Sequence, residues 1–299
     1  MSTKRIIIIV GPTAIGKTNL SIELAKALNT EIISCDSRQF YKELLIGAAP
    51  PNEQELNSIK HHFIHNLSVT DDYNVGKFEE DVISTINNLH KTEDDIVVVG
   101  GSGLYVNAIC NGFDKMPEIP NKLRKHLNLE FKNNGLSWLQ KEVAAIDSEF
   151  YNSCDIRNPQ RLLRALEVYK ASGNTLSSYK SNKPKIRPFE IVKIGLDTDR
   201  AELYNRINTR VDLMMEAGLL EEVESLIKFK DKNSLQTVGY KEIFDFYDKK
   251  YSLEEAVNAI KQNTRRFAKR QLTWFRKDKE IKWFSTDQIK EIKSFIGLL

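Results

Sequence analysis

The chain has 299 residues, which is enough for one large or two modest domains with a buried core. Its composition, 41% hydrophobic and 28% charged residues, excludes a disordered or fibrous protein, and a formal net charge of +3 is too small to indicate a nucleic-acid binder on its own. The three cysteines are widely spaced without a C-x-x-C pair, which argues against a disulfide scaffold or a zinc site. No apolar run is long enough for a signal peptide or a membrane span, so we expect a cytoplasmic protein without a membrane partner.

The chain begins with an apolar run, residues 6–10, that leads directly into a G-x-x-x-x-G-K-T pattern. This order predicts a strand, a phosphate-binding loop and a helix over 17–28. The glycines allow a tight turn whose N–H groups point at an anion, and the positive end of the helix dipole faces the same anion. Lys17 adds a positive charge, and the Thr18 hydroxyl can hold a magnesium ion. We therefore predict a diphosphate or triphosphate site formed by Gly11, Pro12, Thr13, Ala14, Ile15, Gly16, Lys17 and Thr18.

A second strand is predicted over 31–34 and ends in the polar turn Cys35-Asp-Ser-Arg-Gln39. In open parallel sheets, ligands bind at the carboxyl ends of the strands, so Asp36 is expected to face the same cleft as the phosphate loop. The alternative is a solvated loop residue or a helix cap, and the turn alone leaves both open.

Residues 40–75 are predicted to be irregular and contain three histidines, His61, His62 and His65. Because no carboxylate or cysteine stands at ligand spacing, we favour structural or substrate-edge polar groups over a metal site.

A helix is predicted over 75–89, followed by a buried strand over 96–99 that ends in Gly100-Gly-Ser-Gly-Leu-Tyr105. P-loop NTPases commonly place an aspartate near the end of such a strand to help hold magnesium. Here the acids, Asp94 and Asp95, precede the strand instead. This weakens an ATP-hydrolysing interpretation and leaves Asp36 as the acidic group of the cleft.

Prolines bracket the next segment, with Pro117 and Pro120 before it and Pro184 and Pro188 after it. The pattern between them is helical, and we predict a core in two parts, 1–117 and 188–299, around an inserted helical domain, 118–187. Residues 121–183 hold eleven Lys and Arg against six Asp and Glu, a net of +5, which leaves −2 for the rest. A basic insertion suggests a nucleic-acid clamp, although charge alone leaves open the solvated lid of a small-molecule kinase.

The second part of the core is predicted to contain a strand over 190–196 and a helix over 200–217 that stops at Gly218. A helix over 245–260 with a break near Tyr251 precedes a further, basic helix. The chain closes with a strand over 281–284 and a terminal helix.

The basic helix carries seven Lys and Arg between 261 and 277, with Asp278 the only acid from 258 to 278. The spacing predicts a stripe of Lys261, Arg265 and Lys269. It also predicts a separate apolar face of Ile260, Phe267 and Trp274. A charge run this one-sided favours contact with phosphates over a merely solvated face.

Together these motifs resemble the bacterial tRNA dimethylallyltransferases, also called tRNA isopentenyltransferases. The resemblance runs nearly end to end, over Gly11 to Thr18, Asp36-Ser-Arg-Gln39, Gly100 to Tyr105, Asn158-Pro-Gln-Arg-Leu-Leu-Arg-Ala-Leu-Glu-Val168, Val238-Gly-Tyr-Lys-Glu242, Thr264-Arg-Arg-Phe-Ala-Lys-Arg-Gln271 and the Thr-Trp-Phe-Arg276 that follows. The chain departs from the family pattern at Leu45-Ile-Gly-Ala-Ala-Pro-Pro51, where the family reads Asp-Ile-Gly-Thr-Ala-Lys-Pro, at Ser102 for a usual Thr, and at His65 and Asn158 for usual Asp residues.

The resemblance implies a P-loop NTPase-like parallel sheet flanked by helices, with an inserted all-helical domain. It implies transfer of the dimethylallyl group of dimethylallyl diphosphate to the exocyclic amine of the adenosine 3′-adjacent to the anticodon of tRNA, with release of diphosphate. Lys17 and a magnesium ion on Thr18 would stabilise the leaving diphosphate, Asp36 would accept the proton of the amine, and Ser102 would orient the amine or its base. The protein would act as a monomer. The anticodon stem-loop would be held by Asp36, Ser37, Arg38, Gln39, Ser102, Arg124, Gln160, Arg161, Leu162, Leu163, Arg164, Arg265, Arg266, Lys269 and Arg270.

Two other functions are compatible with parts of the sequence. A P-loop kinase with a helical lid explains the phosphate loop and the insertion but leaves the basic helix without a role. A non-catalytic RNA-binding protein could use the loop to bind a phosphate, but this function leaves Asp36 without a role.

Overall fold

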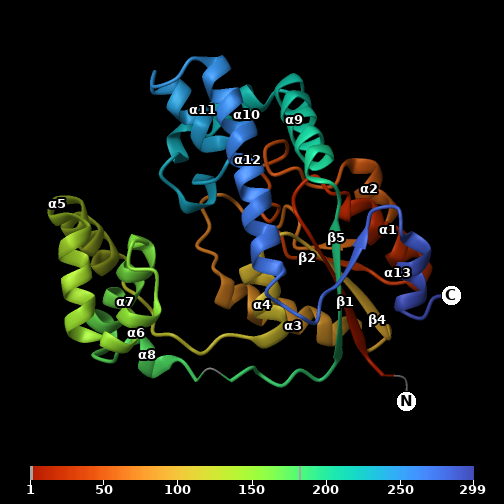
Figure 1. Ribbon diagram of the computed structural model, residues 1–299, viewed down its shortest axis with the longest axis horizontal. Coiled ribbons are helices and arrows are strands. Elements are labelled where there is room, and N and C mark those ends of the chain that lie inside the picture. The colour runs from red at the N-terminus through yellow and green to blue at the C-terminus, as the bar shows by residue number, and fades with distance from the viewer. Residues whose placement is uncertain (1–2, 182) are drawn as a thin grey trace. The chain divides into compact units, whose positions relative to one another are not determined.

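Six parallel strands form one sheet in the order β3–β2–β4–β1–β5–β6 (Figure 1). The computed structural model describes residues 3–181 and 183–299. The strands are β1 (Arg5–Val10), β2 (Ile32–Ser34), β3 (His61–His62), β4 (Asp95–Val99), β5 (Glu190–Asp197) and β6 (Lys282–Ser285). The predicted fold class, a parallel sheet flanked by helices with helices inserted between its strands, is confirmed.

The first strand lies at the centre of the sheet because its side chains are apolar on both faces. Residues 6–9 are isoleucines without exposed surface, as expected for a strand covered on both sides. β1 pairs with β4 on one side and β5 on the other, with Ile9 opposite both Val99 and Ile194. The carboxyl ends of β1, β2 and β4 therefore meet at one edge of the sheet, where the chain turns into its predicted phosphate loop.

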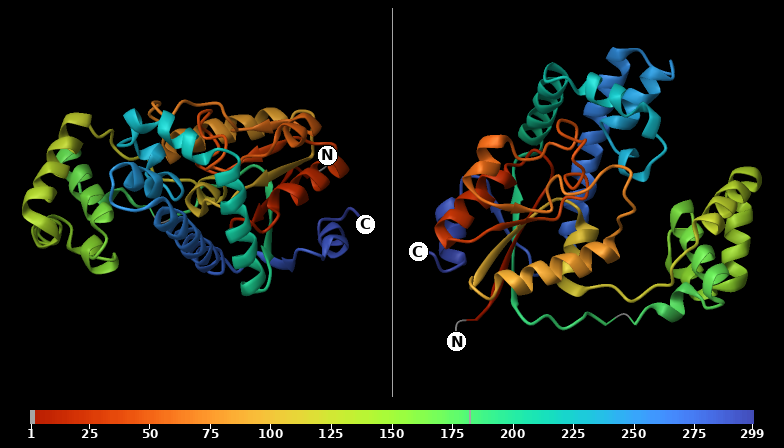
Figure 2. Two further views of the ribbon diagram at one scale, coloured as in Figure 1. Left: turned by 90° about the horizontal axis from the view of Figure 1, so that it is seen from above. Right: turned by 180° about the vertical axis from the view of Figure 1, so that it is seen from behind.

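Helices cover both faces of the sheet (Figures 1 and 2). One core joins the side chains of Ile7 and Ile9 to helices from both ends of the chain, namely α1 (Lys17–Leu28), α9 (Arg200–Glu216), α12 (Leu253–Phe275) and α13 (Ile289–Phe295). Helices α3 (Val75–Leu89) and α4 (Gly103–Asn111) lie on the opposite face. The remaining helices of this part are α2 (Glu53–Ser58), α10 (Leu219–Ser225), α11 (Tyr240–Tyr247) and the 3₁₀ helices η1 (Ile227–Phe229) and η2 (Asn233–Leu235).

The helices predicted over 17–28 and 75–89 have these same bounds in the structure. The predicted break near Tyr251 is confirmed, because α11 ends at Tyr247 and α12 begins at Leu253. The predicted boundary between a helix that ends at residue 260 and a separate basic helix is wrong, because α12 runs without a break to Phe275. Ser252 caps the start of α12 in a capping box with Glu255, and no glycine or proline interrupts the following residues. The segment over 40–75 also contains α2 and β3, which the sequence did not predict.

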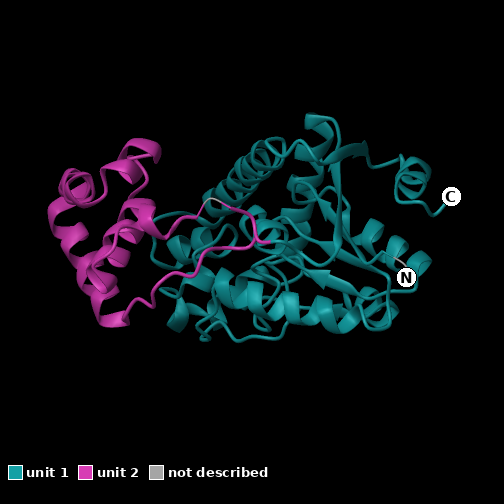
Figure 3. Cartoon of the chain, turned by 90° about the horizontal axis from the view of Figure 1, so that it is seen from below, with its two compact units in different colours: residues 1–111, 186–299 teal, residues 112–185 magenta. Residues whose placement is uncertain are grey.

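The chain divides into two compact units, residues 1–111 with 186–299, and residues 112–185 (Figure 3). The second unit is entirely helical and contains α5 (Asn121–Ile146), α6 (Ser148–Ser153), α7 (Pro159–Ser172) and α8 (Leu176–Tyr179). It has its own core, to which Leu139, Val143 and Leu166 contribute, and α5 bends at Gly135, where φ is 74°. None of the helices in the described residues is long and apolar enough to cross a membrane.

Candidate active site

A cavity of about 310 Å³ opens at the carboxyl-terminal edge of the sheet, in the first unit. It brings together the phosphate loop, the acidic turn after β2, the loop before α2 and one helix from the second half of the chain. Its lining residues are Thr13, Ala14, Ile15, Gly16, Lys17, Thr18, Asn19, Ser21, Asp36, Gln39, Ala48, Ala49, Pro50, Pro51, Glu55, His61, Ile64, Val99, Gly100, Arg206 and Arg210. Asp36 and the loop therefore share one cavity, as the edge of a parallel sheet requires.

The phosphate loop needs its glycines for two separate reasons. Gly16 has φ of 101° and lies directly before α1, in a left-handed conformation that a side chain would strain. Gly11 has φ of 150°, and a Cβ atom there would lie 2.8 Å from the carbonyl oxygen of Leu196 in β5. Between them, Ala14 also has a positive φ, of 65°. The loop thus holds a tight turn against the neighbouring strand, with the first turn of α1 at the cavity.

Lys17 lies in this turn with its ammonium group held by main-chain oxygens. Its Nζ atom donates to the carbonyl oxygens of Gly11, at 3.1 Å, and of Pro12, at 2.8 Å. Burial lowers the pKa of Lys17 from 10.5 to about 8, while the nearby carboxylate of Asp36 raises it and the guanidinium of Arg210 lowers it further. The side chain is therefore still largely charged at neutral pH, and an anion beside it would raise its pKa again.

Asp36 lies at the end of β2 with a carboxylate that accepts the backbone N–H of Arg38, at 3.2 Å. Burial raises the pKa of Asp36, and the N–H group of Arg38 and the charge of Lys17 oppose this shift. A carboxylate with a raised pKa is a stronger base than an exposed one. Asp36 is thus the acidic group of the cavity that is suited to accept a proton.

Two arginines of α9 line the cavity, and the sequence analysis missed both. Arg210 Nη1 lies 3.4 Å from Thr13 Oγ1, and Arg206 Nη1 lies 3.4 Å from the carbonyl oxygen of Ile15. Burial lowers the pKa of Arg210, whose charge is countered by Asp36. The two arginines are four positions apart, so they lie on one face of a helix whose extent was predicted, and this spacing was the signal available.

The remaining residues of the acidic turn are committed to contacts within the protein. Ser102 Oγ accepts the backbone N–H of Ser37 at 3.2 Å and lies 3.2 Å from its hydroxyl oxygen. Arg38 donates from Nη1 to the carbonyl oxygens of Asn233 and Ser234, at 3.0 and 2.8 Å. These contacts hold the turn in place, and Ser102 does not itself line the cavity.

Gln39 uses both ends of its amide within the protein. Its Nε2 atom donates to the carbonyl oxygen of Ala49 at 3.0 Å, and its Oε1 atom accepts from Ser34 Oγ at 3.1 Å. Gln39 thus ties β2 to the loop that forms one wall of the cavity.

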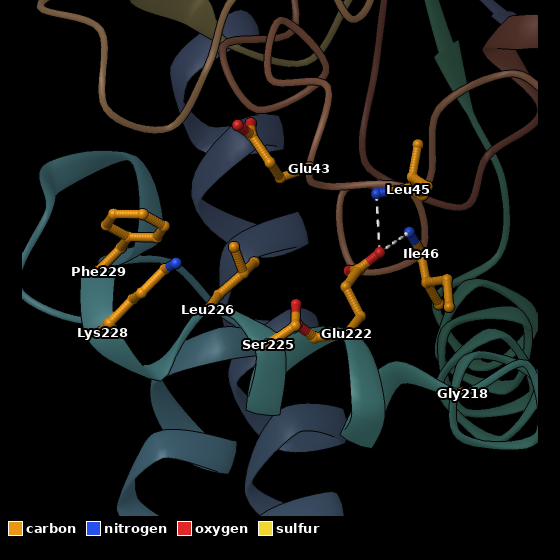
Figure 4. A pocket seen from close by; sticks show the side chains of 9 residues that line it. All are labelled: Glu43, Leu45, Ile46, Gly218, Glu222, Ser225, Leu226, Lys228 and Phe229. Carbon is orange, nitrogen blue, oxygen red and sulfur yellow. Dashed lines mark hydrogen bonds between the residues drawn. The ribbon is translucent and has the colours of Figure 1, made fainter.

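Glu222 of α10 holds the start of that same loop (Figure 4). Its carboxylate accepts the backbone N–H groups of Leu45 and Ile46, each at 2.8 Å, and of Gly47 at 3.0 Å. The hydroxyl of the fully buried Tyr240 donates to the same carboxylate at 2.7 Å. A Cβ atom at Gly47 would lie 2.6 Å from the Tyr240 ring, so the close approach requires glycine. The segment over 45–51, which departs from the family pattern, is therefore held at its first three residues by hydrogen bonds to Glu222.

The donors of the cavity fit a magnesium ion that is bound largely by phosphate oxygens and water. Thr18 lines the cavity and carries a hydroxyl oxygen, the kind of hard donor that magnesium binds, and magnesium commonly takes only one or two protein ligands beside a phosphate. The described residues contain no group of three His, Cys, Asp or Glu side chains that could form an all-protein metal site. Asp94 and Asp95 lie at the opposite edge of the sheet, where they pair with Lys4 at 2.8 Å and with Arg5 at 2.6 Å.

The histidines do not gather around a common point that could hold a metal among the described residues. His62 Nε2 pairs with Glu31 at 2.5 Å. His61 lines the cavity with its Nδ1 atom 2.9 Å from the carbonyl oxygen of Ile59, and burial lowers its pKa. His61 is thus a polar group at the edge of the site.

Comparison with known proteins assigns this site to a family. The model of the family described as IPP transferase matches residues 39–278. This chain belongs to that family. It is 51% identical to a tRNA dimethylallyltransferase of Christiangramia forsetii, with 94% of this chain and 93% of the relative aligned, and 48% identical to one of Flavobacterium johnsoniae, with 95% of each aligned.

Solved structures agree with this assignment. A tRNA isopentenylpyrophosphate transferase of Bacillus halodurans matches with a TM-score of 0.72 and 37% identity, over 98% of this chain and 95% of that chain. A eukaryotic dimethylallyltransferase acting on tRNA matches with a TM-score of 0.78 and 25% identity, over 98% of this chain and 76% of that chain.

Helix α12 distributes the residues predicted to contact RNA over two environments. Lys261 pairs with Asp212 of α9 at 2.5 Å, and Arg265 Nη1 donates to Asn208 Oδ1 at 2.6 Å, so this side of the predicted stripe packs against α9. A second group is exposed and consists of Arg266, Lys269 and Arg270.

The predicted apolar face of α12 is wrong at two of its three positions. Phe267 and Trp274 are 37% and 46% exposed, and of the predicted residues only Ile260 is buried. The buried face instead follows the three- and four-residue spacing of Ala256, Ile260, Ala268, Gln271 and Phe275.

The residues of the helical unit that were predicted to contact RNA differ in their exposure. Gln160 and Arg161 are exposed near the start of α7, and Arg164 and Arg124 lie by the buried carboxylate of Glu167, at 3.7 and 3.2 Å. Leu162 and Leu163 are 0% and 3% exposed. Their assignment to RNA contact is corrected, because their side chains form the core of this unit while their neighbours in the motif face outward.

We expect the affinity for inorganic diphosphate to fall by about tenfold between about pH 7 and about pH 9. The pKa of Lys17 is about 8, so its ammonium group is lost across this range, and the neutral amine no longer attracts the anion. Isothermal titration calorimetry on the wild type and on Lys17→Met measures this, and the ratio of the two affinities removes the titration of the ligand itself. If the ratio of the wild-type affinity to the Lys17→Met affinity is constant with pH, the ammonium group of Lys17 does not titrate in this range or does not contribute to binding.

We expect Glu222→Ala to lower the free energy of unfolding by about 2 to 3 kcal/mol, because three N–H groups and the Tyr240 hydroxyl lose one shared acceptor. Urea unfolding followed by circular dichroism gives the value. The matched control is Glu221→Ala at the exposed neighbouring position, which should change stability by less than about 0.5 kcal/mol. A loss equal to that of the control would show that water replaces the carboxylate without cost.

Proposed function

We propose that this protein transfers the dimethylallyl group of dimethylallyl diphosphate to the exocyclic amine of the adenosine 3′-adjacent to the anticodon of tRNA. The observation that carries the proposal is one cavity in which a phosphate-binding loop faces a carboxylate with a raised pKa. The names of the relatives, tRNA dimethylallyltransferases, support the same reaction.

The leaving group of this reaction is diphosphate, and the cavity is built to stabilise it. The bond between the first carbon of the dimethylallyl group and the diphosphate oxygen breaks, so negative charge grows on that oxygen. Lys17, Arg210 and the positive end of the α1 dipole surround the place where the diphosphate would lie. Fixed positive charge in a site that excludes water stabilises such a transition state strongly.

The amine that attacks must lose a proton once its nitrogen–carbon bond has formed. Asp36 is the residue we assign to accept this proton, since burial makes its carboxylate more basic than usual. Ser102 would act on the geometry of the acidic turn through Ser37, whose N–H and hydroxyl it contacts. Ser102 is therefore a positioning residue in this proposal rather than a direct partner of the amine.

We include magnesium as the cofactor, with Thr18 as its protein ligand together with oxygens of the diphosphate. When bound there, such an ion would neutralise part of the negative charge that develops on the leaving group. Lys17 and Arg210, which also line the cavity, contribute positive charge from the chain itself.

The tRNA must present an unstacked adenine, because a base within a stacked loop cannot enter a cavity of this size. We assign backbone contacts to the exposed Arg266, Lys269 and Arg270 of α12, and contacts with the anticodon stem-loop to Arg124, Gln160, Arg161 and Arg164 of the helical unit.

We expect the protein with tRNA, labelled dimethylallyl diphosphate and magnesium to place the label on an adenosine, which nucleoside analysis by mass spectrometry identifies. Asp36→Asn should lower turnover by about a hundredfold or more, because its amide cannot accept the proton, while tRNA affinity changes little. Parallel reactions with ATP should show no transfer of its terminal phosphate. Labelled tRNA from the variant at the wild-type rate would remove Asp36 from its role, and ATP turnover without prenyl transfer would favour a kinase.

We expect Lys269→Ala to weaken tRNA binding and to reduce the slope of log affinity against log salt concentration by about one, since one phosphate contact is lost. Fluorescence anisotropy with labelled tRNA over a salt series measures the slope. Lys261→Ala is the matched control, because Lys261 is paired with Asp212 and should release few counterions. Equal slopes for Lys269→Ala and the wild type would mean that this face of α12 is only solvated.

A further inference from the structure

A buried glutamine of α12 joins the two main-chain turns on which the cavity is built. Gln271 is 5% exposed and reaches the sheet edge with its side-chain amide. Its Oε1 atom accepts the backbone N–H of Thr13 in the phosphate loop, at 2.9 Å. Its Nε2 atom donates to the carbonyl oxygen of Gly101, in the turn after β4, also at 2.9 Å. One side chain therefore bonds to both turns.

The glycine motif after β4 is shaped to receive this helix. A Cβ atom at Gly101 would lie 2.2 Å from Gln271 Nε2, and one at Gly103 would lie 2.3 Å from the Trp274 ring. Side chains at these two positions would push α12 away from the turn. The glycines thus act as a docking surface for α12, in addition to ending the strand.

The contact at Thr13 bears directly on the phosphate loop. Thr13 is held on two sides, by Gln271 at its N–H group and by Arg210 at its hydroxyl oxygen. The next residue, Ala14, takes a positive φ of 65°, which is a conformation that a chain adopts only where its neighbours enforce it. An anchor at Thr13 therefore acts at the point where the loop is strained.

We propose that Gln271 is a positioning residue that holds the phosphate loop in the conformation that grips diphosphate. The proposal rests on the proposed function in one respect, that diphosphate is the group bound at this loop. Gln271 does not line the cavity, so it acts through Thr13 and Gly101 rather than on the substrate. An amide suits the position at neutral pH, because one end must accept a hydrogen bond and the other must donate one, which an ionised carboxylate cannot do.

Two isosteric substitutions separate this role from simple packing. Gln271→Met fills the same volume without donor or acceptor, so a packing role predicts little change. Gln271→Glu keeps the acceptor for Thr13, but its ionised carboxylate cannot donate to Gly101. A protonated carboxyl group does both, so lowering the pH restores the pairing in this variant alone. The matched control is Gln262→Ala, at an exposed position of the same helix.

We expect calorimetry with inorganic diphosphate and magnesium to show about tenfold weaker binding for Gln271→Met, with Gln262→Ala within about twofold of the wild type. Hydrogen exchange should show that the Thr13 amide loses its protection in Gln271→Met. The deficit of Gln271→Glu relative to the wild type should shrink between about pH 8 and about pH 5.5, which keeps the test decisive if the methionine variant fails to fold.

Affinities within about twofold of the wild type for both variants, with Thr13 still protected, would overturn the proposal. A constant deficit of Gln271→Glu at all pH values would also overturn it. Because the ligand is inorganic diphosphate with magnesium, and no prenyl donor or tRNA is present, these results do not depend on prenyl transfer. A wild-type protein that binds diphosphate as described but leaves tRNA unmodified would overturn only the proposed function.

Discussion

The burial of opposite charges in one small cavity is the constraint on which the rest of the structure depends. Lys17, Arg210 and Asp36 each lose hydration there. Asp36 stabilises the two cations and is stabilised by them, whereas Lys17 and Arg210 repel each other. Lys17, Arg206 and Arg210 outnumber Asp36 and Glu55 among the lining residues, so the cavity favours an added anion and gains most from one that carries several charges. This balance requires that a loop, a strand end and a distant helix meet at one edge of the sheet.

The structure meets this requirement with polar side chains, buried or half-buried, that form hydrogen bonds to main-chain groups of loops and turns. Glu222 takes three N–H groups of the loop over 45–51, Gln39 takes a carbonyl of the same loop, and Gln271 takes one group from each of two turns. Each contact satisfies a main-chain group that would otherwise lose its hydration without a partner. The loop over 45–51 and the two turns are therefore held by side-chain hydrogen bonds, although none of the three is regular structure.

Local patterns predicted the parts of this protein that depend on neighbours in sequence. The strand, loop and helix over 5–28 and the helix over 75–89 follow from apolar periodicity and glycine placement, and the structure has them at nearly the same residues. The arginines of α9 were missed because their meeting with the phosphate loop depends on the order of strands in the sheet. The same limit applies to Leu162. The motif over 158–168 was interpreted as one RNA-contact surface, but its side chains alternate between the core of the helical unit and the solvent.

The positions of the aspartates distinguish this phosphate site from the site of an ATP-hydrolysing enzyme. Asp94 and Asp95 pair with Lys4 and Arg5 at the start of β4, so they stabilise the edge of the sheet that lies away from the cavity. The end of β4 carries glycines instead, and these admit the Gln271 amide and the Trp274 ring. The space that an acidic side chain would need is filled by α12, which also presents exposed basic residues to solvent. In this fold, a basic helix is attached at the site that commonly holds a metal-binding aspartate, and Asp36, in the turn after the neighbouring strand β2, is the residue that we propose to accept the proton.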